Sequence, residues 1–102
     1  MQKILNEFEK YCSDPEIDSG KARSYAFAIK YLCDYLEIYT IDDNSVSQLK
    51  SVEGDIRNKE SMLYNDLIKF LSARRQKSYL EKGWIRAALK HFFAFYKNTV
   101  NN

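Results

Sequence analysis

Apolar residues recur at three- and four-residue steps along most of this chain, and this spacing constrains the fold more than any other feature of the sequence. The clearest case is the segment 20–38, where one face collects Tyr25, Ala28, Ile29, Leu32, Tyr35 and Leu36. Because 3.6 residues make one helical turn, these side chains form a wide apolar stripe, with Arg23 and Lys30 on the opposite face. The segment is predicted to be a long helix that packs on a core through one side.

Four further segments show the same spacing, and short polar connections separate them. They cover about residues 2–13, a stretch from a cap within 42–44 to Ile56, a stretch that begins near Ser61, and residues 78–98. Ser78 and Glu81 match the S-x-x-E capping box that starts many helices. With 3 glycines and 1 proline in 102 residues, few turn residues of a sheet protein are present. We predict an all-α protein, a single compact bundle of four to five helices that forms one domain over residues 1–102.

Composition and run length narrow the class of protein further. Hydrophobic residues make up 45% of the chain and aromatic residues 15%, which is enough for a packed core. No apolar run approaches the ~20 residues that cross a bilayer, and acidic residues enter too early for a signal peptide. Cys12 and Cys33 lie in apolar helical patterns without a metal-binding spacing. We expect buried free thiols rather than a disulfide, in a cytoplasmic protein without a membrane partner.

Charge is distributed unevenly along the chain. The net charge is only +2, yet residues 1–68 carry 8 Lys/Arg against 13 Asp/Glu, while residues 69–102 carry 8 against 1. This asymmetry indicates an anionic partner, with solvated helix faces as the alternative explanation. No acidic residue occurs from Lys82 to Asn102, whereas an ordinary exposed helix places Glu four residues from Lys. The charge pattern therefore favours a nucleic acid.

The basic residues of the last predicted helix fall on one face. Lys82, Arg86 and Lys90 follow each other at four-residue steps, about 6 Å apart along the helix. Phosphates along one DNA strand recur at a comparable interval, so the stripe predicts contacts to the backbone of double-stranded DNA. Five more cations could extend this surface: Arg74, Arg75, Lys77, Arg23 and Lys30. We interpret the adjacent Trp84 as a core anchor, with a partly exposed platform for a base or sugar as the alternative.

Residues with catalytic chemistry are sparse. His91 is the single histidine, and no acidic residue lies within four positions of it, so we expect neither a catalytic triad nor a metal site. The three glycines stand alone and form no phosphate-binding loop. We therefore expect a chain that is not an enzyme by itself and has no metal, cofactor or small-molecule substrate.

Two stretches together resemble a known type of domain. They are GKARSYAFAIKYLCDYL at residues 20–36 and SYLEKGWIRAALKHFFAFYKN at residues 78–98. This pair is similar to the helices of the N-terminal domain that precedes the nuclease domain in many bacterial modular restriction endonucleases, often of the HNH type. The motif AALKHFF at Ala87–Phe93 also resembles the closing helix of the SAM-like core-binding domain of tyrosine recombinases and phage integrases.

The resemblance implies a DNA-binding, non-catalytic module that is the N-terminal part of a larger DNA-processing enzyme. The restriction-type version is favoured, because the segment Ile41–Ala88 is longer than the integrase pattern and Glu81 stands where Ser or Thr is usual. The alternatives are an integrase or recombinase core-binding domain and a protein–protein dimerisation domain. A homodimer could pair acidic with basic surfaces or use a patch of exposed rings, namely Tyr31, Tyr39, Phe93 and Tyr79.

Overall fold

Every regular element is helical in the part of the chain that the computed structural model describes, which is the backbone of residues 1–100 and the side chains of residues 1–99. The elements are α1 (Gln2–Cys12), a short 3₁₀ helix η1 (Ser19–Lys21), α2 (Ala22–Leu36), α3 (Asp43–Ile56), α4 (Met62–Ala73), α5 (Ser78–Glu81) and α6 (Trp84–Val100). The predicted all-α bundle is confirmed, with 6 α-helices in the described part instead of four or five.

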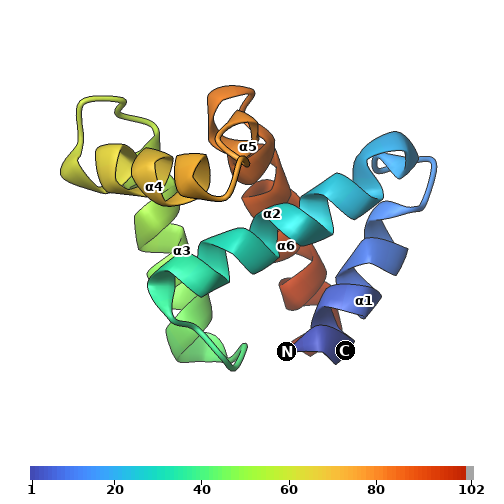
Figure 1. Ribbon diagram of the computed structural model, residues 1–102. Helices are drawn as coiled ribbons and strands as arrows, with labels where there is room; N and C mark the ends of the chain where they lie inside the picture. Colours follow the sequence, from blue (N-terminus) through green and yellow to red (C-terminus); the bar gives the residue numbers. More distant parts are fainter. Residues whose placement is uncertain (101–102) are drawn as a thin grey trace.

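Helices α2 and α6 cross at the centre of the bundle (Figure 1). Helix α1 packs against both of them, while α3 packs against α6 and against α4. The radius of gyration of the Cα atoms is 12.9 Å, close to the ~13 Å of a compact domain of this length. None of the helices within residues 1–100 combines the length and apolarity that a membrane crossing requires.

The core lies where the predicted apolar stripes of α2 and α6 meet. Five of the six residues that the spacing predicts on the inward face of α6 are buried, namely Ile85, Ala88, Leu89, Phe92 and Phe95, and the sixth, Tyr96, is half-buried. On α2, Tyr25, Ala28, Ile29 and Leu32 are buried, and Tyr35 and Leu36 are half-buried. Phe8 connects α1 to this core, since its ring meets the Phe92 ring edge-on with the centroids 5.1 Å apart.

Two of the predicted helix starts are confirmed by their capping hydrogen bonds. Asp42 and Ser45 form a reciprocal capping box at α3, in which each side-chain oxygen accepts the other residue's backbone N–H at 2.9 Å. At α4 the Ser61 hydroxyl oxygen accepts the backbone N–H of Tyr64 at 3.0 Å. Both caps satisfy amide groups that a helix leaves without an internal partner.

The last helix differs from its prediction, because the segment 78–98 contains two helices. Ser78 and Glu81 form no capping box, since the residue preceding α5 is Lys77 and no side chain caps that helix. Arg75 takes a left-handed conformation with φ 60°, which ends α4 and places Ser78 directly in a helical turn. Gly83, with φ 77°, then separates α5 from α6. A glycine adopts this conformation without the steric penalty of a Cβ atom, so the chain changes direction there.

Three buried side chains that lose a proton at alkaline pH are expected to make the stability of the fold depend on pH. Burial raises the pKa of the Cys12 and Cys33 thiols from 9.0 to about 12. Burial likewise raises the pKa of Tyr25 from 10.0 to about 12, and the hydrogen bond that its hydroxyl donates to Asp18 at 2.8 Å adds to this shift. Since all three pKa values are higher in the folded state, their contribution to stability is complete below pH 9.0 and is lost as the pH rises toward 12.

Urea unfolding between about pH 8 and pH 11 measures this effect. The free energy of unfolding should fall above about pH 9, by up to ~1.4 kcal/mol per pH unit for each group between its two pKa values. A Cys33→Ala variant should show a shallower decline with pH, whatever its stability at neutral pH. A free energy of unfolding that stays constant over this range would contradict the prediction.

Candidate nucleic-acid interface

The predicted stripe of Lys82, Arg86 and Lys90 is divided by the break at Gly83. Lys82 follows α5, and its Nζ lies 5.3 Å from the centre of the Trp84 ring. Arg86 and Lys90 lie one turn apart on α6 and line a depression that α3 completes. The prediction of one continuous basic stripe on a single helix is therefore wrong, because a left-handed glycine redirects the chain between its first and second members.

Two neighbouring depressions follow the line between α3 and α6. One part, of about 660 Å³, is lined by the first half of α3 and the last half of α6, with Val46, Phe93 and Ala94 among its apolar residues. A second part, of about 370 Å³, lies between the end of α3 and the start of α6, with Gly83 and Ala87 in its lining. The start of α3 thus meets the end of α6, so the two helices run in opposite directions. We call the two parts together the α3–α6 groove.

Cations outnumber acids in the lining of the α3–α6 groove. Its five basic residues are all exposed: Lys50, Arg57, Arg86, Lys90 and Lys97. Its two acids, Asp43 and Glu53, are already bonded. Glu53 Oε1 pairs with Arg57 Nη2 at 2.8 Å, and Asp43 Oδ1 accepts a hydrogen bond from the Tyr96 hydroxyl at 2.8 Å. This bond, together with burial, raises the pKa of Tyr96.

Four of these cations lack an ion-pair partner. Among the side chains of residues 1–99, the Glu53–Arg57 pair is the one ion pair present. Lys50, Arg86, Lys90 and Lys97 therefore have no carboxylate at ion-pair distance in this part of the chain. Lys50 instead lies near the Phe93 ring, with Nζ 5.8 Å from the ring centre. The groove thus combines a net positive lining with cations that remain available to an anion.

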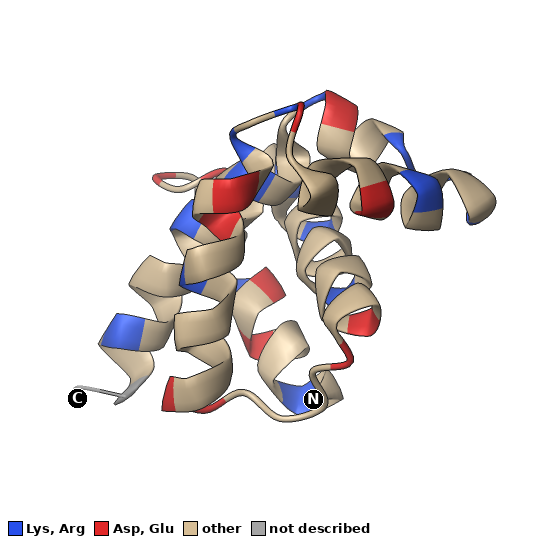
Figure 2. Cartoon of the chain, turned by 90° about the vertical axis from the view of Figure 1, so that its left-hand side faces the viewer, with Lys and Arg blue, Asp and Glu red and all other residues tan. Residues whose placement is uncertain are grey.

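The two oppositely charged parts of the sequence do not form two charged halves of the molecule. Figure 2 shows Lys and Arg distributed among Asp and Glu over the molecule, although α6 itself carries no acid. Packing causes this mixing, because α3 belongs to the acidic part of the chain and lies against α6 of the basic part. The excess of basic over acidic residues is confined to parts of the surface, and one such part is the α3–α6 groove, to which both helices contribute cations.

The three cations between α4 and α5 lie outside the α3–α6 groove. Arg74 folds back on its own helix: Nη1 donates to the Phe70 carbonyl at 3.1 Å, and the guanidinium carbon lies 3.6 Å from the centre of the Phe70 ring. Arg75 and Lys77 are exposed in the turn itself. None of the three lines the depression that Arg86 and Lys90 share.

The two candidates on α2 are also separate from the groove. Arg23 stacks on Phe27, with its guanidinium carbon 5.5 Å from the ring centre. Lys30 lines a shallow depression between α1 and α2 that Glu9 also lines. Although α2 packs against α6, neither Arg23 nor Lys30 lines the α3–α6 groove.

Three residues of the groove were not among the predicted sites, and each had a detectable signal. Lys97 is seven residues after Lys90 on the same helix, which is two turns, so it lies on the face of Arg86 and Lys90. Lys50 on α3 and Arg57 immediately after its last residue are seven residues apart, which is two helical turns and hence the same face. Spacing could identify the cations of α3 as one group and those of α6 as another. Only the packing of α3 on α6 shows that both groups line the same groove.

The interpretation of Trp84 as a core anchor is wrong. Trp84 is half-buried and does not belong to the buried core. It lies on the first turn of α6, immediately after the change of direction at Gly83, and its ring meets Tyr79 edge-on with centroids 5.1 Å apart. Lys21 and Lys82 both place Nζ near its face, at 4.9 and 5.3 Å from the ring centre.

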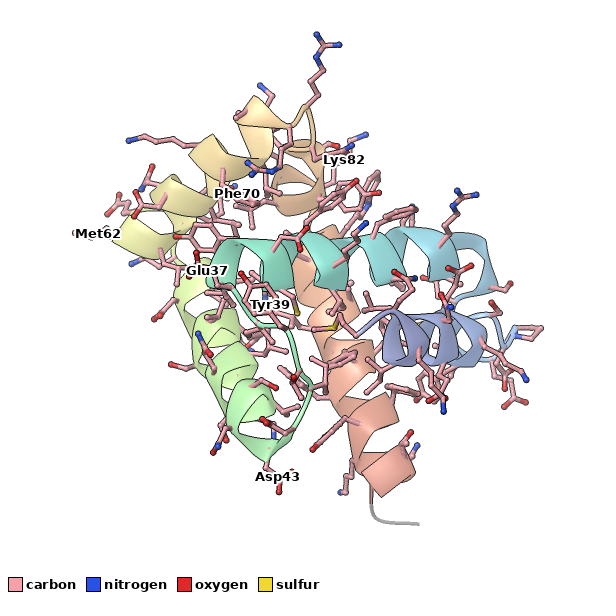
Figure 3. All side chains as sticks on the ribbon, turned by 60° about the horizontal axis from the view of Figure 1, so that its bottom comes forward. Glu37, Tyr39, Asp43, Met62, Phe70 and Lys82 are labelled. Carbon is pink, nitrogen blue, oxygen red and sulfur yellow. The ribbon has the colours of Figure 1, made fainter. Side chains whose placement is uncertain are left out.

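The four rings considered for a dimer contact do not lie in one patch. Tyr31 and Tyr79 meet edge-on at 5.2 Å, whereas Phe93 lines the α3–α6 groove. Tyr39 is 75% exposed and borders a different depression, beside the start of α1. Figure 3 shows Tyr39 between α2 and α3 and Lys82 at the α5 end of the molecule.

The single histidine and the two cysteines are packed against other residues. His91 lies against Tyr25, with ring centroids 5.3 Å apart, and both cysteines are buried free thiols. Within residues 1–100, no three His, Cys, Asp or Glu side chains gather in a way that could hold a metal ion. Comparison of the chain with protein-family models, with curated proteins and with solved structures finds no match. What the molecule does is therefore inferred from its own surfaces.

Proposed function

We propose that this chain is a non-catalytic DNA-binding module that holds duplex DNA by its phosphates along the α3–α6 groove. The supporting observation is that two helices contribute unpaired cations to the groove, while its two acids are already bonded to Arg57 and Tyr96. These four cations are Lys50, Arg86, Lys90 and Lys97. On α6, Arg86 and Lys97 are about 16 Å apart along the helix axis, a length over which duplex DNA presents several phosphates.

The lining between the cations suits a sugar–phosphate backbone. Ala87 and Ala94 have short side chains, so a strand can approach α6 between the longer basic residues. Arg86 can bind a phosphate through two parallel N–H donors, whereas the lysines act as point charges. Such contacts position DNA without reading its sequence. We expect weak binding that depends strongly on salt, with dissociation constants of roughly micromolar or higher at physiological salt.

The resemblance to restriction endonucleases gives this module a context within the proposal. Its role would be to hold DNA for a nuclease domain of a larger, cytoplasmic DNA-processing enzyme. A core-binding domain of an integrase or recombinase is the alternative context, with the same expected contact to duplex backbone. The reading frame that follows codon 102 in the natural gene distinguishes the two.

Titration of duplex DNA at about 50 and 200 mM salt tests the proposed groove. The triple variant Lys50→Ala, Arg86→Ala, Lys90→Ala should bind more weakly at both salt concentrations. The slope of log K against log salt should also become shallower by up to about 2.7, because each lost phosphate contact contributes ~0.9. Fluorescence anisotropy of a labelled duplex measures both quantities.

A control variant with the same change in charge separates the groove from net charge. Lys3→Ala, Lys10→Ala, Lys69→Ala removes three exposed cations of α1 and α4 that do not line the groove. Equal losses of affinity in the two variants, or no binding by the unmodified chain at low salt, would overturn the proposal. Sedimentation in the same buffers tests the charge-paired homodimer, which should dissociate as salt rises.

A further inference from the structure

Four aromatic rings from three helices form a row on another surface of the molecule. Phe27 and Tyr31 stack on α2 with centroids 6.1 Å apart, and Tyr31 meets Tyr79 of α5 edge-on at 5.2 Å. Tyr79 in turn meets Trp84 of α6 edge-on at 5.1 Å. All four rings are half-buried, so each keeps part of its surface in contact with solvent. We call this set the aromatic row.

Exposed cations accompany both ends of the aromatic row. Lys21 and Lys82 place Nζ 4.9 and 5.3 Å from the centre of the Trp84 ring, and Arg23 lies 5.5 Å from the centre of Phe27. Glu81, beside Lys82 in the sequence, is exposed and is not in an ion pair within residues 1–99. The surface is therefore aromatic along its length, with three cations and one acid beside it, and its net charge is positive.

We propose that the aromatic row with Lys21, Arg23 and Lys82 is a binding site for single-stranded nucleic acid. Proteins that bind single strands combine cations for the backbone with aromatic side chains on which unpaired bases stack. Trp84 supplies the largest ring and lies outside the buried core. Lys21 and Lys82 both hold Nζ over this ring, so a base that stacks there would displace the ammonium groups toward its own phosphates. Duplex DNA cannot use this site in the same way, because its bases are already stacked on one another.

The site is distinct from the α3–α6 groove and goes beyond the proposed duplex contact. None of the four rings lines that groove, and the two surfaces share no cation. Gly83 separates them: Lys82 before it belongs to the aromatic row, and Arg86 after it belongs to the groove. A module with both surfaces can hold a duplex through one and an adjoining unpaired strand through the other.

Trp84 is the single tryptophan of the chain, so its fluorescence reports on this site when it is excited at the long-wavelength edge of the indole absorption, where the 8 tyrosines do not absorb. Titration with oligo(dT) or oligo(U) of about eight nucleotides at ~50 mM salt should quench this fluorescence, because a stacked base quenches an indole. An abasic oligonucleotide of the same length carries the phosphates without the bases and should quench far less. Binding by the DNA or the RNA oligonucleotide supports the site, and binding by neither overturns it. Equal quenching by the abasic strand also overturns it, since the row would then bind only anionic charge.

Variants measured by anisotropy of a labelled oligo(dT) complete the test. Trp84→Leu keeps an apolar side chain but loses the stacking surface, and should bind about 5- to 150-fold more weakly, whereas Trp84→Phe should retain most of the affinity. The pair Lys21→Ala, Lys82→Ala leaves the ring in place and should weaken binding with a shallower salt dependence. Circular dichroism checks that each variant is folded. Unchanged affinity in Trp84→Leu and in the lysine pair would overturn the proposal.

The groove triple variant distinguishes this site from the proposed duplex contact. Lys50→Ala, Arg86→Ala, Lys90→Ala should leave the quenching of Trp84 by oligo(dT) unchanged. If duplex binding is absent but oligo(dT) still quenches Trp84, the groove proposal fails and the aromatic row stands. If the triple variant abolishes both, the separate single-strand site is wrong.

Discussion

Replacement of Phe92 by alanine is expected to lower the free energy of unfolding by about 3–5 kcal/mol. Phe92 is 0% exposed, and its ring meets Phe8 of α1 at 5.1 Å and lies 5.9 Å from Phe95. Truncation would leave a cavity where α1 joins α6, and the surrounding rings can fill it only in part. Because domains of this size have stabilities of about 5–15 kcal/mol, this one change should remove a large share of the total.

Phe93→Ala is a matched control, since it removes the same side chain from the next position of the same helix. Phe93 is half-buried and lines the α3–α6 groove beside Lys50, so its loss creates no closed cavity. We expect a loss of about 1 kcal/mol for this variant, in the range of ordinary point mutations. Thermal unfolding followed by circular dichroism compares the two variants. For a domain of this length, the melting temperature should fall by about 4–8 °C for each kcal/mol of stability lost. Equal losses in the two variants would show that α6 is rotated relative to the described packing.

Replacement of Ala88 by leucine is expected to destabilise the fold by about 1–3 kcal/mol. Ala88 is 0% exposed on the inward face of α6, and α2, which packs along α6, also carries a fully buried alanine at Ala28. A leucine at position 88 adds volume to a filled layer of the core, so neighbouring side chains or helices must shift. The direction of this effect is opposite to what hydrophobicity alone predicts.

Ala94→Leu provides the control for Ala88→Leu. Ala94 is exposed on the same helix, and leucine and alanine are both good helix formers, so its free energy of unfolding should change by no more than about 0.5 kcal/mol. Urea unfolding of both variants measures the difference. An Ala88→Leu protein as stable as the unmodified chain would mean that the layer between α2 and α6 holds unfilled space.

Local sequence patterns predict most of the fold. The apolar stripes of α2 and α6 identify their buried faces, because helical periodicity assigns each side chain to a face before any partner is known. The caps at Asp42 and Ser61 were also predictable, since they join residues only three positions apart. Ser78 and Glu81 have the same spacing as a capping box and yet form none, because the left-handed Arg75 places Ser78 inside a turn that has already begun.

The candidate interface was predicted less well than the fold. Arg86 and Lys90 do line one surface, as their four-residue spacing predicts. Lys82 does not join them, because the conformation of one residue, Gly83, decides whether the helix continues. A lone glycine inside a helical pattern is tolerated in many helices, so its presence in the sequence does not show where a helix will stop.

Local spacing in the sequence was enough to show that this chain forms helices and which faces of α2 and α6 are buried, and the composition shows that its carboxyl-terminal part is rich in cations. The helices and their buried faces depend on residues at most one or two turns apart, because helix geometry alone places such residues on one face. Which cations share a surface depends on how the helices pack. The packing of α3 on α6 brings Lys50 to the helix of Arg86 and Lys90, and the turn at Gly83 sends Lys82 to the ring of Trp84. Contacts between residues distant in the chain are set by the fit of whole helices, which no local spacing records.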